Sequence, residues 1–311
     1  MRRPGALAAL TRWLPLALLG VVALLPLGVA DPYWLGVLIL SMYFALISSG
    51  WNLLAGYTGQ FSLAPATFAM LGAYTTGLLC EYAGTPPWLG MIAATFASSI
   101  IGVILALVVM RLSGAYLALT TLSFAEIARL VIANSYDFTR GDRGLGVPGI
   151  FESRVGWYYV VLGALAAVVI GLMLLLRSPM GLYLQAIRDD EVAAASRGVD
   201  VVYWKTVSFT LSSAIAGLAG GLYAHFSQLI SPELGLLTQT GLVICMVVIG
   251  GMGTVIGPLV GAFLVYVLSE MLRGVGGVQL IVFATVVIVI ARFFREGLAG
   301  LARRAGLGKL A

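Results

Sequence analysis

Long apolar runs dominate this chain and leave few folds open to it. Hydrophobic residues make up 60% of the 311 residues and charged residues only 10%, which is too apolar for a soluble domain of this length. Inside a bilayer the backbone must satisfy its own hydrogen bonds, so only helices and closed barrels span it. The runs here are about 20 residues long, as spanning helices are, rather than the roughly 10 alternating residues of a barrel strand. The sequence therefore predicts an all-α fold, a polytopic membrane helix bundle.

About ten apolar segments have the length or composition of transmembrane spans. They cover residues 13–29, 33–55, 63–80, 88–110, 115–133, 157–176, 206–230, 239–252, 254–272 and 278–294. The second is interrupted near Gly56, and the eighth is short. The 39 glycines suit membrane helices whose backbones approach closely. We expect one transmembrane domain over residues 1–311, with glycine-rich broken segments.

Basic residues are distributed unevenly between the two sides of this predicted bundle. With a cytoplasmic N-terminus, the inner loops and termini hold 13 of the 18 lysines and arginines, and the outer loops hold four. The positive-inside rule then places both termini and the loop 177–205 in the cytoplasm, and the loop 134–156 outside. The run 13–29 also resembles a signal peptide, because it follows Arg2 and Arg3 and ends in small residues, but we expect a retained first helix.

Several functional classes find no support in the residues. The net charge of +5 comes mostly from helix ends, where it orients the chain, so nucleic-acid binding is not expected. His225 is the only histidine, and Cys80 and Cys245 lack metal-type spacing, so neither a catalytic triad nor a metal site is predicted. His225 either packs in the bundle or faces a pore. The chain has no phosphate-binding GxxxxGK[ST] loop and is not expected to hydrolyse nucleotide or to act as an enzyme.

Two glycine-rich interruptions lie in different halves of the chain, at residues 56–62 and 250–253. Paired interruptions of this kind mark broken helices around a translocation path, because unwound backbone at membrane depth must be buried or wet. Tight turns at the membrane face explain them equally well. Under the first interpretation, the path candidates from these segments are Gly59, Gln60, Ser62, Gly250, Gly251 and Gly253.

Glu126 and Arg129 are further path candidates, within the fifth predicted span. Three residues apart, they share a helix face and can pair, which offsets part of the about 2.5–3.5 kcal/mol that each costs at the bilayer centre. Two interpretations are open: the pair faces the path, or Arg129 extends toward the outer membrane surface. The polar loop 139–149 that follows either receives a partner or only turns the chain.

The loop 177–205 holds eight of the chain's 31 charged residues. Asp189, Asp190 and Glu191 precede the helix-forming run 192–197, and Gly198 follows it. Acidic residues before a helix and glycine after it are typical caps, so a short helix is predicted. Its small alanine face suits docking in a groove of another protein, and a solvated connector is the alternative.

Together these segments resemble a known family. The matching stretches are 56–63, 116–122, 126–130, 139–149, 177–181, 186–191, 246–253 and 257–258. They are similar to the inner-membrane permease subunits of bacterial ABC importers for branched-chain amino acids, of the LivM type. The resemblance covers most of the chain, and its motifs are specific as a set.

The resemblance implies a multi-pass protein of the bacterial inner membrane with four kinds of neighbour. These are a second, similar permease, two cytoplasmic ATPase subunits that use ATP and magnesium, a periplasmic substrate-binding protein, and membrane lipid. The permease itself would bind no cofactor. The resemblance also assigns coupling to the ATPase to Arg188, Asp189, Asp190, Glu191, Ala193, Ala194 and Gly198.

The chain departs from the family pattern at two places. Glu191 stands one place before the position of the glutamate in the general importer motif, which puts its role in question. Arg140, Asp142 and Arg143 stand where small or neutral residues are more usual, so a charged contact with the binding protein or an altered substrate is implied.

The mechanism that the resemblance implies is alternating access. ATP-driven closure of the ATPases would move the helix at 192–197 and switch the cavity between its inward-open and outward-open states. Two rivals remain: the same architecture carrying urea or short amides, and an ion-driven secondary transporter. The second rival predicts buried carboxylates along several spans, whereas only Glu126 and Glu270 approach that description.

Overall fold

Helices account for most of the structure, a computed structural model that describes residues 6–28, 31–112, 114–273 and 285. In chain order the elements are α1 (Ala6–Gly28), α2 (Pro32–Asn52), the π-helical turn η1 (Leu53–Tyr57), α3 (Pro65–Ala83), α4 (Pro87–Val109), α5 (Gly114–Asn134), α6 (Tyr136–Thr139), the 3-10 turn η2 (Gly141–Arg143), β1 (Leu145–Gly146), α7 (Arg154–Arg177), α8 (Pro179–Asp189), α9 (Glu191–Ser196), α10 (Val201–Ser227), β2 (Leu229–Ile230), the 3-10 turn η3 (Pro232–Gly235), α11 (Leu237–Gly250) and α12 (Ile256–Leu272).

Nine of the ten predicted apolar segments fall mainly on these helices, which confirms the all-α membrane bundle. The tenth, 278–294, lies outside the described residues apart from residue 285. Within the described part of the chain, five helices are long and apolar enough to cross a membrane, namely α4, α5, α7, α10 and α2 with its π-helical turn. The apolar part of α1 and the helices α11 and α12 are shorter.

The predicted interruption at Gly56 is placed differently in the structure. Gly56 lies inside the π-helical turn that continues α2, and the non-helical segment follows it. A Cβ at Gly56 would overlap the side chain of Asn52 and lie 2.7 Å from the backbone nitrogen of Gly253. Glycine is therefore needed there for close approach of another segment, not to end the helix.

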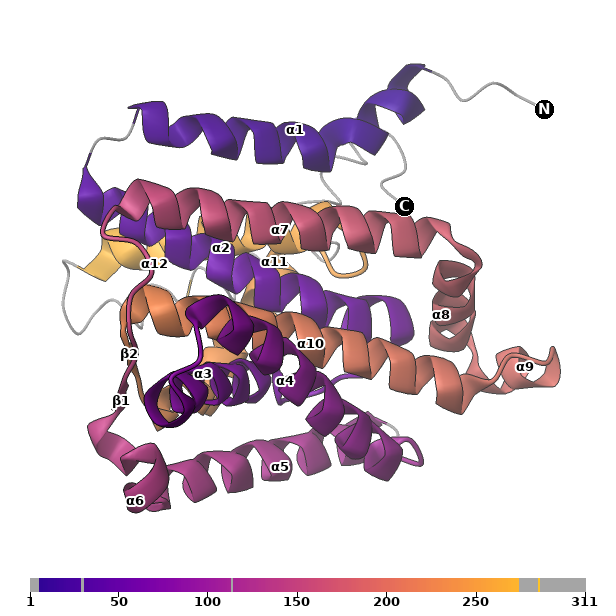
Figure 1. Ribbon diagram of the computed structural model, residues 1–311. Coiled ribbons are helices and arrows are strands. Elements are labelled where there is room, and N and C mark those ends of the chain that lie inside the picture. Colours follow the sequence, from indigo (N-terminus) through magenta and orange to yellow (C-terminus); the bar gives the residue numbers. More distant parts are fainter. Residues whose placement is uncertain (1–5, 29–30, 113, 274–284, 286–311) are drawn as a thin grey trace.

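The long helices give the bundle two ends (Figure 1). At one end, called the α8 end here, α7 finishes, α8 and α9 project beyond the bundle, and α10 begins. At the opposite end, called the β end, lie α6 and the strands β1 and β2. Because α7, α8 and α9 follow one another directly, α9 lies at the end of the bundle where α7 finishes and α10 begins.

The helix α10 runs through the interior and packs against α2, α3 and α4 through small residues. A Cβ at Gly220 would overlap the backbone of Ala69 on α3, and a Cβ at Gly217 would overlap Ser98 on α4. On α4, a Cβ at Gly102 would likewise overlap a serine of α10. These contacts explain the high glycine content, since membrane helices gain packing energy by close backbone approach.

At the β end the loop 139–149 is fastened to α10 and α3. Strands β1 and β2 pair antiparallel, with Leu145 opposite Ile230. His225 is fully buried, and its Nδ1 lies 2.8 Å from the carbonyl oxygen of Pro148 while its Nε2 lies 2.9 Å from the Thr76 hydroxyl. Nδ1 therefore donates to Pro148 and Nε2 accepts from Thr76, so His225 is a packed residue that holds the loop in place.

Candidate coupling site and helix-break junction

The short helix predicted in the charged loop is present as α9, and it is capped at both ends. The Asp190 carboxylate accepts hydrogen bonds from the backbone N–H groups of Val192 at 2.9 Å and Ala193 at 3.0 Å. Gly198 ends the segment with φ of 85°, a left-handed conformation that favours glycine. Local sequence thus fixes where α9 begins and ends, as the capping residues predict.

The two alanines assigned to coupling point in different directions. Ala193 is exposed, next to Val192, whose side chain is 79% exposed at the tip of the α8 end. Ala194 is instead buried and packs with Ile187 of α8 and Val201 of α10. Ala194 therefore holds α9 to its own chain, whereas residues 192–193 and 195–197 are exposed and available to a partner.

Arg188, in the last turn of α8, connects the charged loop to both glycine-rich interruptions. Its guanidinium donates a hydrogen bond to the carbonyl oxygen of Gly56. A Cβ built on Gly253 would lie 2.7 Å from the same guanidinium nitrogen, and one built on Gly59 would lie 3.6 Å from the Arg188 Cγ. The absence of a side chain at Gly253 is what lets Arg188 lie against the second interruption while it binds Gly56 in the first.

The two interruptions also bind each other through Asn52. Its side-chain amide donates to the carbonyl oxygen of Thr254 at 2.9 Å, and its carbonyl oxygen accepts from the backbone N–H of Gly253 at 2.8 Å. Asn52 is almost fully buried, so both bonds form away from water, where an unpaired amide is costly. We call Asn52, Gly56, Arg188, Gly253 and Thr254 the junction.

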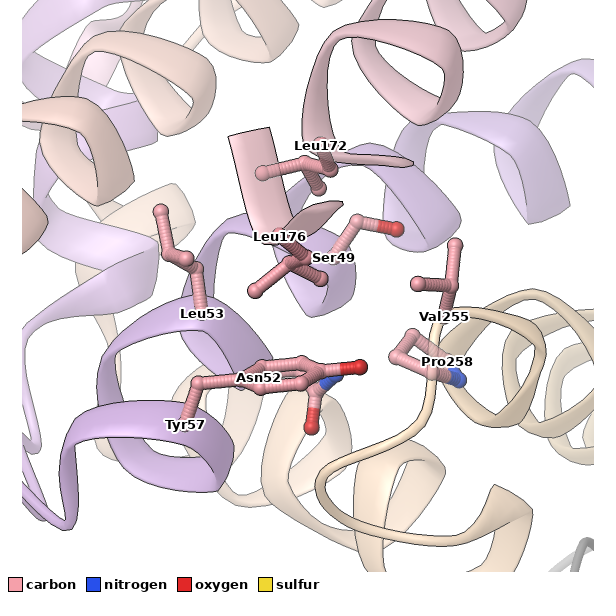
Figure 2. A pocket seen from close by; sticks show the side chains of 8 residues that line it. All are labelled: Ser49, Asn52, Leu53, Tyr57, Leu172, Leu176, Val255 and Pro258. Carbon is pink, nitrogen blue, oxygen red and sulfur yellow. The ribbon is translucent and has the colours of Figure 1, made fainter. Parts of the chain in front are cut away.

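A narrow pocket borders the junction on the side of α7 and α12. Figure 2 shows its lining by eight residues, namely Ser49, Asn52, Leu53, Tyr57, Leu172, Leu176, Val255 and Pro258. The hydroxyl of Ser49 is buried and has no hydrogen-bond partner in the described part of the chain. Three helices and the α11–α12 turn therefore meet around a small space directly beside the segment that Arg188 contacts.

A second link runs from α9 to α10 and on to the first interruption. The Glu191 carboxylate lies 2.6 Å from the Lys205 ammonium, and the Lys205 side chain is only 7% exposed. One turn farther along α10, the Ser208 hydroxyl lies 3.4 Å from the side-chain oxygen of Gln60. Glu191 thus has a clear structural partner within this chain, which accounts for a charged residue at its shifted position.

The remaining path candidates divide into two groups. Gln60 and Ser62 are buried, and the carbonyl of Ser62 accepts a hydrogen bond from the indole of Trp51 at 2.8 Å. Gly250 and Gly251 are buried in the turn between α11 and α12, where a Cβ at Gly250 would overlap Gly257. These residues pack the α8 end. Both interruptions lie at this end of the bundle.

Glu126 and Arg129 lie away from the junction, on α5. Their side chains pair as predicted, with Arg129 Nε 3.0 Å and Nη2 2.5 Å from the two carboxylate oxygens of Glu126. The Glu126 side chain is 49% exposed and the Arg129 side chain 20% exposed. The ion pair is therefore on the outer surface of this chain, and the tertiary structure does not bring it to the other candidates.

Comparison with known proteins identifies the family. The model of the family described as branched-chain amino acid transport system / permease component matches residues 33–291. This chain belongs to that family. The permease is 31% identical to the high-affinity branched-chain amino acid transport system permease protein LivM of Escherichia coli K12, over 91% of this chain and 75% of the relative.

Permeases named LivH match as well. A probable branched-chain amino acid transport permease protein LivH of Methanocaldococcus jannaschii is 28% identical over 74% of this chain and 77% of the relative. No solved structure matches the chain. Membership of a permease family agrees with a multi-pass membrane protein whose role is transport rather than catalysis. Among the described residues, no group of three His, Cys, Asp or Glu side chains could hold a metal ion.

Sequence reasoning missed two residues of the permease's α8 end, Asn52 and Lys205. Asn52 is a polar residue at the end of an apolar run, and Lys205 is one of two lysines in the chain. Polar and charged residues within membrane segments are costly and usually have a partner, which is the signal that singles out both. Their partners lie far away in sequence, so the pattern alone does not name them.

Proposed function

We propose that this permease is the translocation subunit of an ATP-driven importer that carries branched-chain amino acids, leucine, isoleucine and valine, across the bacterial inner membrane. The observation that carries the proposal is the contact of Arg188 with both glycine-rich interruptions. Through it the projecting helices α8 and α9 act directly on the segments where α2 and α11 end. The names of the relatives support the substrate class.

The proposed assembly contains a second permease, two ATPase subunits and a periplasmic binding protein. Similarity to relatives of both the LivM and the LivH type supports a pair of different permeases. The ATPases would bind ATP and magnesium, and this chain would supply no cofactor. The α8 end and both termini would face the cytoplasm, so that the exposed Val192 and Ala193 meet an ATPase and the β end meets the binding protein.

The proposed mechanism is alternating access driven through two contacts, the Glu191–Lys205 ion pair and the hydrogen bond from Arg188 to Gly56. Closure of the ATPases displaces α9, and the Glu191–Lys205 pair transmits the displacement to α10. Arg188 transmits it to the junction, where α2 and α11 end. Nucleotide and loaded binding protein must each bind one state more tightly than the other, because a ligand indifferent to conformation shifts no equilibrium.

The proposal is tested by purifying the tagged chain from detergent-solubilised membranes and assaying leucine uptake in proteoliposomes. We expect an ATPase and a second permease to copurify, and uptake to require ATP and binding protein. Replacing Val192 and Ala193 by aspartate should remove the ATPase, whereas aspartate at Val155, exposed in the first turn of α7, should not. A chain that purifies alone and transports without ATP would be an ion-driven carrier. If urea but not leucine competes for uptake, the substrate is urea or a short amide and not a branched-chain amino acid.

A further inference from the structure

The outer face of α5 differs from the face of an ordinary lipid-exposed span. α5 is the least buried of the five candidate spans. With about 100° between successive residues, five of its seven polar positions fall within about 120° of the helix circumference, and only the buried Thr121 and the partly buried Arg129 lie outside it. The five are Tyr116, Thr120, Ser123, Glu126 and Asn134. Exposed apolar residues, among them Ile127 and Leu130, are interspersed with them. The exposed side of α5 therefore carries a stripe in which these five polar residues alternate with apolar ones, and we call it the stripe.

The neighbouring span α4 shows what lipid contact looks like in the same molecule. Its large exposed side chains are all apolar, namely Trp88, Leu89, Ile92, Phe96, Ile100, Ile104, Leu107 and Val108. This is the surface expected against acyl chains. Since both helices belong to one bundle, the difference between them reflects their surroundings and not the general composition of the chain.

The ion pair makes lipid contact at α5 unfavourable. Counting about 1.5 Å per residue, Glu126 lies about 18 Å along a helix of about 31 Å, deep within the hydrocarbon if α5 spans the bilayer. Its side chain is 49% exposed although Arg129 pairs with it. Charged groups within membrane segments usually face protein or a water-filled cavity, so the exposed side of Glu126 points to such a cavity.

The two aliphatic hydroxyl groups of the stripe donate to backbone within α5 itself. Thr120 donates to the carbonyl of Tyr116 at 2.8 Å, and Ser123 donates to the carbonyl of Leu119 at 3.0 Å. Their oxygen lone pairs remain free to accept from water or solute. Thr120 and Ser123 thus need no fixed protein partner for their donors, which suits a surface along which a solute moves.

Resting on the proposed function, we propose that this face of α5 lines the substrate path, with the second permease subunit closing the other side. The Glu126–Arg129 pair is then a site for the charged groups of a zwitterion. The ammonium group of an amino acid binds the Glu126 carboxylate, and its carboxylate binds the Arg129 guanidinium, which suits bidentate recognition. Urea carries no charge and can form only hydrogen bonds to this pair, without the attraction between opposite charges.

The first test measures whether the stripe is wet in the assembled transporter. In a background with Cys80 and Cys245 replaced by alanine, Ser123→Cys on α5 is compared with Ile100→Cys on the apolar face of α4. Only a hydrated thiolate attacks a charged, water-soluble thiosulfonate reagent, forming a mixed disulfide with loss of sulfinate. We expect Ser123→Cys to react at least about tenfold faster, which corresponds to about 1.4 kcal/mol. Equally slow reaction at both sites would overturn the proposal.

The second test concerns the charges. During turnover with binding protein and ATP, leucine should slow labelling of Ser123→Cys several-fold, whereas urea should not. In the double variant Glu126→Gln, Arg129→Gln, whose amides can still bond each other, protection by leucine should disappear while the unfolding temperature stays near that of the parent. Retained protection would overturn the zwitterion site.

The two tests also separate this inference from the proposed function. A reactive and leucine-protected Ser123→Cys in a chain that purifies without an ATPase would support the path along α5 and overturn the importer. An intact ATP-driven importer in which Ser123→Cys is as unreactive as Ile100→Cys would overturn the path along α5 and leave the importer standing.

Discussion

At the scale of single residues, the α8 end depends on polar groups that reach bare backbone. Arg188 on α8 binds the carbonyl oxygen of Gly56, and Asn52 at the end of α2 binds main-chain atoms of Gly253 and Thr254. The glycines leave this backbone accessible. A guanidinium presents several donors in a fixed fork, so it can hold one carbonyl while lying against a second segment. The junction is therefore specified by residue chemistry at a few positions, and it is sensitive to their replacement.

Replacement of Arg188 by alanine should uncouple ATP hydrolysis from transport. A hydrogen bond to a charged group contributes about 1.5–3 kcal/mol, so its loss corresponds to roughly a tenfold change or more in an equilibrium between states. We expect leucine uptake per ATP hydrolysed to fall about tenfold, with partial recovery in Arg188→Lys, which keeps the charge but not the fork. Uptake and hydrolysis measured on the same proteoliposomes give the ratio.

Arg111 provides the matched control for this change. It is an exposed arginine just beyond the end of α4, and no hydrogen bond to it is present in the described structure. Arg111→Ala removes the same charge without touching the junction, and its transport ratio should stay near the parent value. If the two alanine variants behave alike, the loss reflects net charge and the junction plays no part in coupling.

At the scale of elements, α9 is too short to persist by itself. Isolated helices below about 12–15 residues are marginal in water, and α9 has six. It is held by the Asp190 cap, by the buried Ala194, by the ion pair of Glu191 with Lys205 and by the left-handed end at Gly198. These contacts attach α9 to both α8 and α10, so under the proposed mechanism the three helices would move together.

Gly198→Val should therefore weaken the connection between α9 and α10. A left-handed conformation costs a residue with a side chain about 1–2 kcal/mol, and valine more because it is β-branched. A Cβ at Gly198 meets nothing within 4 Å, so the expected effect is on backbone conformation alone. We predict reduced stimulation of ATP hydrolysis by loaded binding protein, with normal membrane insertion.

Gly163→Val on α7 is the control, since a Cβ there also meets nothing within 4 Å and the backbone is helical. Its stimulated ATPase activity should match the parent. Unchanged stimulation and uptake in Gly198→Val would remove the left-handed helix end from the coupling mechanism.

At the scale of the whole molecule, α10 is the helix around which the bundle closes. Its contacts with α3 and α4 are made through glycines whose replacement would bring side chains into backbone. Gly220→Leu should destabilise the bundle by about 1–3 kcal/mol or more, the usual cost of overpacking, and so lower the midpoint of thermal unfolding by several degrees. Tryptophan fluorescence of the detergent-solubilised protein during heating measures that midpoint.

Gly171→Leu on α7 introduces the same side chain where a Cβ would meet no atom within 4 Å. Its unfolding midpoint should stay close to the parent value. Equal midpoints for the Gly220 and Gly171 variants would show that the α3–α10 contact can relax, and close packing of α10 would not then explain the glycine content.

The sequence alone determined the class of fold, most of the spans and the local shape of the charged loop. Apolar runs as long as the hydrocarbon is thick permit only helices, and Asp190 and Gly198 cap α9 through bonds within a few residues. These outcomes depend on neighbours along the chain, which a sequence displays directly. The pairing of Glu126 with Arg129 one helical turn away belongs to the same group.

Only the tertiary structure decided what meets across the bundle. Asn52 and Thr254 are 202 positions apart, and nothing in either apolar run indicates that they bond. The sequence likewise does not indicate that Ala194 is buried or that Glu126 is exposed. The physical reason is that lipid is as apolar as a protein core, so faces toward lipid and faces toward other helices have similar residues. Periodicity then identifies helices, and packing of small residues and paired polar groups decides how they assemble.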